Sequence, residues 1–265
     1  MGSASKVGAM SEWVEVGDRC WVRRYDEWDL NVGLVAGTDG ALLIDTRATT
    51  EQAEELRDHI GEATDAPVRW VVNTHAHFDH VVGNSLFDQA EVIAHENAAA
   101  AAKLTATTFS VAKVVDLGDR RVELLHLGNA HTDGDVVVVV PDVDVFFVGD
   151  LIEESAPPSY GDDSYPLEWP DTIDRVIGLL SDTAKVVPGH GAVADAEFVR
   201  DQADDLGTVA NTISGLHHAG TPLDDALKHT DDWPWPLEKL QDAIKRGYEA
   251  LGTPRRPTLP LLGPG

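Results

Sequence analysis

The sequence predicts an α/β protein in which two β-sheets pack against each other between layers of helices. Short apolar segments with the character of strands alternate with helical segments in the order strands, helix, strands, helix, which is typical of packed layers. Turn-forming pairs such as Gly17-Asp18 and Asp39-Gly40 separate the strands. With 265 residues, of which 43% are apolar, the chain is long enough to bury a large core.

The first half predicts a group of strands, a helix and a further strand–helix pair. Strands are expected at residues 13–16, 20–25, 31–36 and 41–45. A helix follows with Thr50 as its expected N-cap, because Glu51 and Glu54 then lie near the positive end of the helix dipole. After Pro67 we expect a buried strand over 68–73, a short helix from Val81, a strand over 91–94 and an alanine-rich helix over 95–104.

The second half repeats this order and ends in helices. Strands are expected over 111–116, 122–127, 136–140 and 145–148, a helix over 170–180, a strand over 185–187 and helices over 196–218 and 237–250. This predicts a flexible amino terminus at 1–11, a main domain at 12–218 and a helical carboxyl-terminal appendage at 219–265 that packs on the same domain. The appendage has an apolar stripe at helical spacing, formed by Leu237, Leu240, Ile244, Tyr248 and Leu251. We expect this stripe to close the subunit's own core, while a contact between identical chains stays an alternative.

Composition limits the partners and the compartment. The chain has 46 acidic and 20 basic residues, a net charge of −26, which argues against a nucleic-acid partner because the phosphates would be repelled. The simplest interpretation is the solvated surface of a salt-adapted or high-GC organism. No apolar run reaches the length of a membrane span. A single cysteine, Cys20, and an amino terminus without a secretory apolar segment predict a reducing, cytoplasmic location.

The most informative segment is the run from Thr74 to His80, which has four side chains able to bind a metal. His75, His77 and Asp79 alternate, so on an extended backbone they point to the same side, whereas His80 points elsewhere. One ion would not need four ligands in a single turn. The run therefore predicts two ions side by side.

Further along the chain, His131, Asp150 and His190 lie after or near apolar strand-like segments. With the first run they give seven nitrogen and carboxylate ligands, a set suited to two divalent ions. Histidine and carboxylate suit zinc, iron and manganese, and zinc is the expected metal. The other histidines (His59, His95, His126, His217, His218 and His229) have no clustered partners and are expected to be ordinary surface or core residues.

Four motifs together resemble the metallo-β-lactamase superfamily. The run THAHFDH resembles its H-x-H-x-D-H signature, and residues 128–135 resemble its second histidine motif. Val148-Gly149-Asp150 and Pro188-Gly189-His190-Gly191 resemble its bridging-aspartate and last histidine motifs. The order and spacing fit over roughly residues 12 to 215. The resemblance implies a four-layer αβ/βα sandwich, with two mixed sheets between helices and the metal site at one edge.

The resemblance also implies a division of the ligands that agrees with their spacing. His75, His77 and His131 would bind one ion, Asp79, His80 and His190 the other, and Asp150 would bridge them. Metal-bound hydroxide is then the expected nucleophile, with Asp79 and Asp150 as the catalytic carboxylates. Asp135, four residues after His131, is expected to orient an imidazole.

The expected reaction is hydrolysis of a small ester, lactone, thioester or amide. The superfamily hydrolyses these bonds, β-lactams and phosphodiesters, and one branch oxidises sulfur. The stretch after Asp150 has Glu153 and Glu154 where β-lactamases carry a lysine for the substrate carboxylate, so β-lactamase activity is expected only as a weak side reaction. A mononuclear-iron sulfur dioxygenase and a metal-dependent binding protein without turnover remain alternatives.

Substrate contacts are expected from the segment 151–169, interpreted as a loop stiffened by prolines, and from an early turn. Tyr160, Tyr165 and Trp169 would supply apolar walls and a hydroxyl donor, and Trp28 the opposite wall. Acidic residues in this segment predict neutral or cationic small-molecule substrates. The sequence leaves open the physiological substrate and the oligomeric state.

Overall fold

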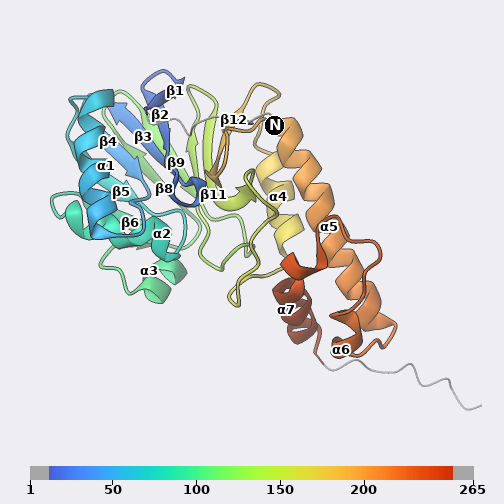
Figure 1. Ribbon diagram of the computed structural model, residues 1–265. Helices are drawn as coiled ribbons and strands as arrows, with labels where there is room; N and C mark the ends of the chain where they lie inside the picture. Colours follow the sequence, from blue (N-terminus) through green and yellow to red (C-terminus); the bar gives the residue numbers. More distant parts are fainter. Residues whose placement is uncertain (1–11, 253–265) are drawn as a thin grey trace, which may run out of the picture.

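In the computed structural model, which describes residues 12–252, two β-sheets pack face to face with helices on both outer sides (Figure 1). The first sheet has seven strands in the order β1 to β7: Val14–Gly17, Cys20–Arg24, Asn31–Gly37, Gly40–Ile44, Val68–Val72, Glu91–His95 and Thr107–Phe109. Strands β1 to β4 pair antiparallel and β4 to β7 parallel, so the sheet is mixed.

The second sheet has five strands in the order β12-β11-β10-β9-β8. The strands are β8 (Ala112–Asp116), β9 (Arg121–Leu125), β10 (Val137–Val140), β11 (Val145–Glu153) and β12 (Lys185–His190). Strands β8 to β11 pair antiparallel, and β12 joins β11 in parallel. This sheet is therefore also mixed, as the four-layer fold requires.

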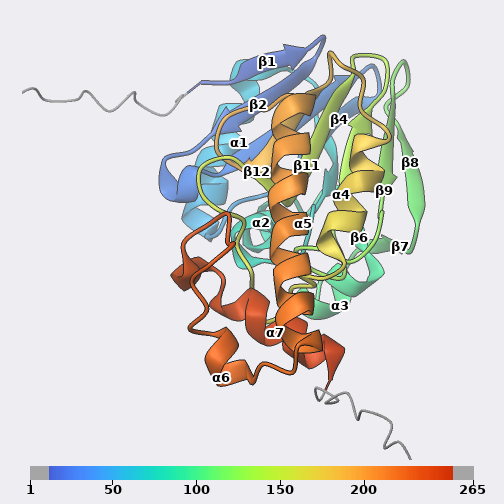
Figure 2. The same cartoon turned by 90° about the vertical axis from the view of Figure 1, so that its right-hand side faces the viewer.

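The helices form the two outer layers. They are α1 (Thr50–Ala63), α2 (Phe78–Val81), α3 (Glu96–Ala102), α4 (Trp169–Ile177), α5 (Ala196–His218), α6 (Leu223–Ala226) and α7 (Gln241–Leu251), with short 3₁₀ turns η1 (Glu27–Asp29), η2 (Val82–Leu86) and η3 (Leu237–Lys239). In Figure 2, α4 and α5 lie in front of the second sheet and cover its outer face. Within residues 12–252 no helix has both the length and the apolar character needed to cross a bilayer.

Three apolar clusters explain the layers. Because β3 and β4 are buried on both faces, their successive residues enter different clusters. Leu34 packs with α1 in one cluster, while the next residue, Val35, packs between the sheets together with Phe147. A third cluster joins the second sheet to α4, α5 and α7. The predicted four-layer αβ/βα sandwich is confirmed.

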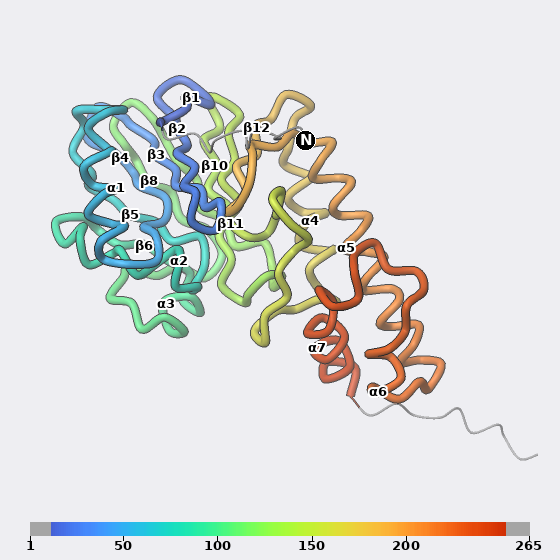
Figure 3. Tube along the Cα trace, viewed as in Figure 1, coloured from blue at the N-terminus to red at the C-terminus, as the bar shows by residue number. Residues whose placement is uncertain are grey.

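The carboxyl-terminal stripe also packs within this chain. Figure 3 shows the chain turning back after α5, so that α7 lies beside it. Leu240 and Ile244 are fully buried, and Tyr248 nearly so, in the cluster that contains Ile213 of α5. Gly247 allows this approach, because a Cβ there would lie 2.6 Å from Ile213 Cγ2. The buried stripe favours the core interpretation over a contact between copies, and the expected flexible segment at 1–11 lies outside the described residues.

Two sequence expectations for local structure were wrong. The N-cap of α1 is Thr49, whose hydroxyl accepts from the Gln52 N–H at 3.2 Å, rather than Thr50. Strand β11 does not end at Val148 but continues to Glu153. Gly149, with φ +54°, produces an irregular register that lets the strand bend past Thr74 and still pair with β12. The expected loop 151–169 is therefore shorter at both ends, since Trp169 begins α4.

Candidate metal centre

The turn after β5 is held by Asp45, which follows β4 in the left-handed region (φ 65°). Its buried carboxylate accepts from the Thr74 backbone N–H at 2.8 Å and from the Thr74 hydroxyl at 2.7 Å. It also lies 2.8 Å from Nδ1 of His80. Asp45 was expected only as the last residue of the strand 41–45, whereas the structure gives it the role of fixing the turn that supplies four ligands.

The structure brings together all seven predicted ligands. Ligand atoms within 4.8 Å of one another form two main groups, and both are almost entirely buried. The first group is His75, His77, His131 and Asp150, and the second is Asp79, His80 and His190. This matches the predicted division between two ions. A further group, which the sequence interpretation missed, joins Asp150 and His190 to Glu153.

Contacts at Nδ1 orient four of the five imidazoles. His75 Nδ1 lies 3.1 Å from the Thr74 hydroxyl, and His80 Nδ1 faces Asp45 as described. Backbone carbonyls face Nδ1 of the other two rings. The Ser159 carbonyl lies 3.0 Å from His131 Nδ1, and the Trp28 carbonyl lies 2.7 Å from His190 Nδ1. These contacts fix the ring orientations and leave Nε2 as the free ligand atom of each ring.

His77 is oriented the other way round. Its Nε2 lies 3.1 Å from Oδ2 of Asp163, and its Nδ1 lies 2.9 Å from Nε2 of His131. Nδ1 is therefore the ligand atom that His77 presents to the first group. Asp163 was not among the expected site residues, because nothing in its sequence context linked it to His77.

Asp150 lies between the two groups. Its Oδ2 is 3.7 Å from His75 Nε2, 3.5 Å from His131 Nε2 and 3.4 Å from His190 Nε2. Its Oδ1 is 3.3 Å from His80 Nε2. Ligands bound tetrahedrally at 2.0–2.1 Å from one zinc ion lie about 3.3–3.4 Å apart. These separations thus suit ligands of shared ions better than direct hydrogen bonds.

Unpartnered polar atoms support a metal site at this position. His75 Nε2, His80 Nε2 and Asp150 Oδ1 are buried and have no hydrogen-bond partner among residues 12–252. Buried polar groups nearly always have a partner, so three such atoms facing one another need an explanation. Divalent ions would satisfy all three, and the residues present therefore fit the metals that the ligand set suggests.

Burial and charge set the ionisation of the metal-free site. Burial lowers the pKa of His75 well below its ordinary value and that of His131 to about 4, so both rings are neutral at pH 7. Burial acts to lower the pKa of His190 as well, but the Asp150 carboxylate outweighs it and raises that pKa to about 9. Metal binding at the second group must therefore displace a proton from His190.

The expected role of Asp135 was wrong. Its carboxylate accepts from the Thr132 backbone N–H at 2.9 Å and from the Thr132 hydroxyl at 2.6 Å. Among residues 12–252 no hydrogen bond joins this carboxylate to an imidazole, although the Asp135 backbone carbonyl lies 2.9 Å from His126 Nδ1. The Ser159 carbonyl orients His131 instead. Burial raises the pKa of Asp135 to about 7. Asp135 thus closes the turn after His131 and acts on the ligand only through the backbone.

A cavity of about 630 Å³ opens onto the metal centre and shows which expected substrate residues can be reached. Trp28 and Tyr160 line it. Trp28 is 52% exposed and meets the 56% exposed Phe78 edge to face, with ring centroids 5.5 Å apart. Phe78, which the sequence interpretation did not single out, therefore shares this rim.

Two expected substrate residues lie elsewhere. Trp169 is fully buried, donates its indole N–H to the Leu151 carbonyl at 3.1 Å and packs against the His131 ring, so it supports a ligand rather than a substrate. Tyr165 lines a separate cavity of about 300 Å³ beside Arg246. Both corrections follow from the start of α4 at Trp169, which draws this end of the expected loop into the core.

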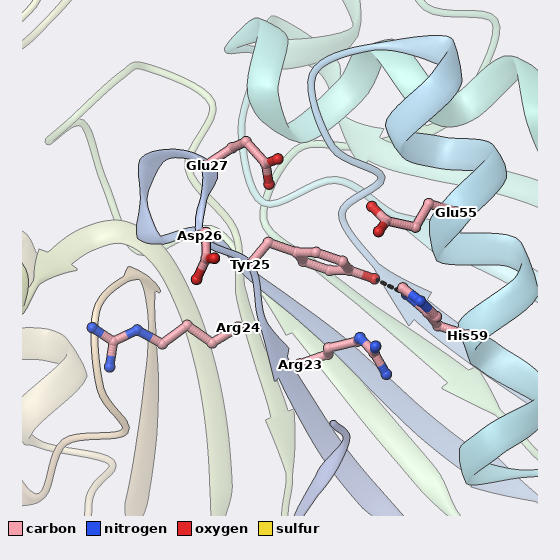
Figure 4. A pocket seen from close by; sticks show the side chains of 7 residues that line it. All are labelled: Arg23, Arg24, Tyr25, Asp26, Glu27, Glu55 and His59. Atoms are coloured by element: carbon pink, nitrogen blue, oxygen red, sulfur yellow. Dashed lines mark hydrogen bonds between the residues drawn. The ribbon is translucent and has the colours of Figure 1, made fainter. Parts of the chain in front are cut away.

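A third, smaller cavity of about 170 Å³ lies between β2, η1 and α1 (Figure 4). The Tyr25 hydroxyl lies 3.2 Å from His59 Nδ1 inside it. On its η1 side, Arg24 holds Asp29 through two contacts of 2.5 Å, and Arg47 holds Glu27 at 3.0 Å. These ion pairs fix η1, the turn whose Trp28 carbonyl orients His190.

Fold and ligand set together define a protein with the αβ/βα architecture and histidine–aspartate centre of metal-dependent hydrolases. The profile of the family described as the metallo-beta-lactamase superfamily matches residues 25–190, and the chain belongs to this superfamily. The metallo-beta-lactamase type 2 of Bacillus cereus is 28% identical over 173 residues, which is 62% of this chain and 68% of that protein. The corresponding protein of Bacteroides fragilis is 24% identical over 175 residues, 63% of this chain and 70% of that one.

A solved structure agrees with the family. The metallo-beta-lactamase from Pontibacter korlensis superposes with a TM-score of 0.63 at 26% identity and covers 74% of this chain and 98% of its own. The predicted membership is confirmed. About a quarter of this chain has no counterpart in that neighbour.

Proposed function

We propose that this protein is a dinuclear metal-dependent hydrolase that cleaves a small ester, lactone, thioester or amide. The observation that carries this proposal is the pair of ligand groups with Asp150 between them, and the unpartnered ligand atoms that face the space between the groups. Two bound divalent ions would polarise the scissile carbonyl and activate a water molecule. The three imidazoles of the first group favour zinc, while iron and manganese remain alternatives.

The protein's own residues position these parts. Asp150 lies between the two groups, with Oδ2 facing His131 and His190 and Oδ1 facing His80, and its charge would offset part of that of the ions. Asp79 lines the cavity, with Oδ2 3.5 Å from His190 Nε2, so it can both hold an ion and accept a proton from a water molecule in the cavity. The aromatic rim of Trp28 and Phe78 excludes water from one side of a bound substrate.

The outer wall of the cavity favours neutral or cationic substrates. Two exposed carboxylates, those of Glu238 and Asp242, line it with one ammonium group, that of Lys239. Glu238, Lys239 and Asp242 come from the carboxyl-terminal segment, beyond the residues that the family profile matches. A β-lactam carries a carboxylate, which this wall would repel, so β-lactam hydrolysis is proposed only as a weak side reaction.

The second ligand group distinguishes this proposal from a mononuclear-iron sulfur dioxygenase. An enzyme with one ion has no need of Asp79, His80 and His190 as a complete additional group, whereas a dinuclear centre does. We propose that the substrate is a small molecule. A cytoplasmic location and assembly with identical chains remain expectations from the sequence.

The test combines metal content with a substrate panel. After reconstitution with zinc we expect near two equivalents by elemental analysis, and about one in a His190→Asn variant. His218→Asn, at an exposed position on α5, serves as the matched control and should keep both ions. Neutral esters or lactones should be hydrolysed faster than phosphodiesters and carboxylated β-lactams at low ionic strength. A single stable equivalent, or equal turnover by the metal-free protein, would overturn the proposal.

A further inference from the structure

Glu153 is a buried carboxylate that the ligand assignment does not use. It ends β11, three residues after Asp150, is only 6% exposed and lines the metal cavity. Gln202 of α5 fixes its backbone at both polar groups: Oε1 accepts the Glu153 N–H at 3.0 Å, and Nε2 donates to the Glu153 carbonyl at 2.7 Å. The position of this carboxylate is therefore set by the scaffold.

The hydrogen bonding of the Glu153 carboxylate is incomplete, and its nearest basic group is the imidazole of His190. Among residues 12–252 the only hydrogen bond to the Glu153 carboxylate comes from the Ser155 hydroxyl, which donates to Oε1 at 2.6 Å, and no lysine or arginine pairs with it. A buried carboxylate that is neither paired nor metal-bound is unfavourable. A nearby metal ion would remove that cost.

Glu153 lies close enough to the second ligand group to bind the same metal ion. Its ligand atom lies within 4.8 Å of those of Asp150 and His190, and all three residues are buried. Glu153 is also paired with His190 across the β11–β12 ladder. The pairing of β11 with β12, rather than a mobile loop, thus brings Glu153 to the second metal position as its third carboxylate.

We propose that Glu153 is a further ligand of the second metal, which gives this position two imidazoles and three carboxylates. Five ligands rich in oxygen suit manganese or ferrous iron better than tetrahedral zinc, whereas the three-imidazole position keeps its preference for zinc. The proposal rests on the metal pair of the proposed function but not on hydrolysis. It predicts a centre whose two positions differ in metal preference.

The experiment is a Mn²⁺ titration of the metal-free full chain, followed by the electron paramagnetic resonance signal of free Mn²⁺. On this proposal the second metal position binds Mn²⁺ more tightly than the first position does. Glu153→Gln should weaken Mn²⁺ binding at that tighter position by about 10- to 100-fold, the scale found for groups that support a bound metal, and should weaken Zn²⁺ less. Glu154→Gln removes the same charge from the next residue, which belongs to none of the ligand groups, and should stay within about twofold of the wild type.

Glu153→Asp separates ligation from charge. It keeps the charge but withdraws the carboxylate by one methylene, so a ligand role predicts a loss as large as that of Glu153→Gln. Unchanged Mn²⁺ affinity in either Glu153 variant would overturn the proposal. Far-ultraviolet circular dichroism of each metal-free variant checks that the fold is retained. A wild type that binds Mn²⁺ at the second position through Glu153 yet hydrolyses nothing would overturn the proposed function and leave this inference standing.

Discussion

The two ligand groups of the centre are held by different parts of the molecule. The first group has three imidazoles, and two of its three supports lie in the segment between β11 and α4: the Ser159 carbonyl holds His131, and the exposed Asp163 holds His77, while the Thr74 hydroxyl faces His75. The second group mixes imidazole with carboxylate: buried Asp45 at the end of β4 holds His80, and the Trp28 carbonyl in η1 holds His190. The first position is thus a three-nitrogen site with partly solvated supports, and the second an oxygen-rich site with a rigid frame.

This difference indicates which contacts matter most. A support buried at a strand end cannot be replaced by water, whereas an exposed support can. Substitutions of the groups that support the second ligand group should therefore reduce metal affinity more than equivalent substitutions at the first ligand group. Replacement of Asp150 should have the largest effect, because its carboxylate faces imidazoles of both groups.

Replacing Asp150 by asparagine should give the largest effect. It removes the charge that lies between the groups and replaces one of the two carboxylate oxygens by an amide NH₂, so we expect kcat to fall at least about 100-fold, the scale of one lost electrostatic contact in a reacting site. Metal content should fall below two equivalents. Asp182→Asn, at a 96% exposed side chain, is the matched control. Retention of both ions and of kcat would show that Asp150 is not shared.

Replacing Asp45 by asparagine tests the frame of the second position. Its carboxylate fixes the Thr74 turn and His80 Nδ1 together, so we expect the affinity for the second ion to fall about 10- to 100-fold while the first ion is retained. Isothermal titration with Zn²⁺ measures both steps. Asp39→Asn, in the exposed turn before β4, should bind as the wild type does. Equal weakening of both steps would mean that Asp45 holds the whole turn rather than the second position.

The sequence predicted the metal ligands but not the residues that hold them in place. The ligands were predictable because they fall in short motifs after strands, and parallel strand ends meet at one edge of a sheet. Asp45 was missed although Ile44-Asp45 resembles Val148-Gly149-Asp150 as an apolar strand ending in aspartate; only the parallel pairing of β4 with β5 shows that it faces Thr74. The signal was present, but its meaning depended on the sheet order.

Glu153 and Trp169 were misjudged for a tertiary reason. The strand pattern in the sequence stops at the Gly149 irregularity, yet pairing with β12 continues β11 to Glu153. At the other end, Pro170 lies in the first turn of α4, a position that favours proline, so the helix rather than the loop includes Trp169. Proline content alone could not distinguish a stiff loop from a helix start.

Replacing Asp163 by alanine tests the exposed support of the first position. Its contact with His77 is partly solvated, with half of the Asp163 side chain exposed, so we expect less than about a tenfold loss in affinity for the first ion. Asp162→Ala removes the same charge from the exposed neighbouring residue and should have no measurable effect. A loss of metal affinity as large as that expected for Asp45→Asn would contradict the proposed difference between the exposed and the buried support.

The smallest effect is expected at Asp135, behind His131, and it should appear in stability rather than activity. Because burial raises the pKa of Asp135 from 3.8 to about 7, the folded state holds a proton that the unfolded state has lost over this range. The contribution of this group to the free energy of unfolding is therefore full below about pH 4, falls as the pH rises and levels off above about pH 7. An asparagine at this position would stay neutral and could still accept from the Thr132 N–H. In urea unfolding of the metal-free proteins, the free energy of unfolding of Asp135→Asn should thus rise relative to that of the wild type as the pH increases from about 5 to about 8. A constant difference across this range would mean that the Thr132 contacts, rather than burial, control the ionisation of Asp135.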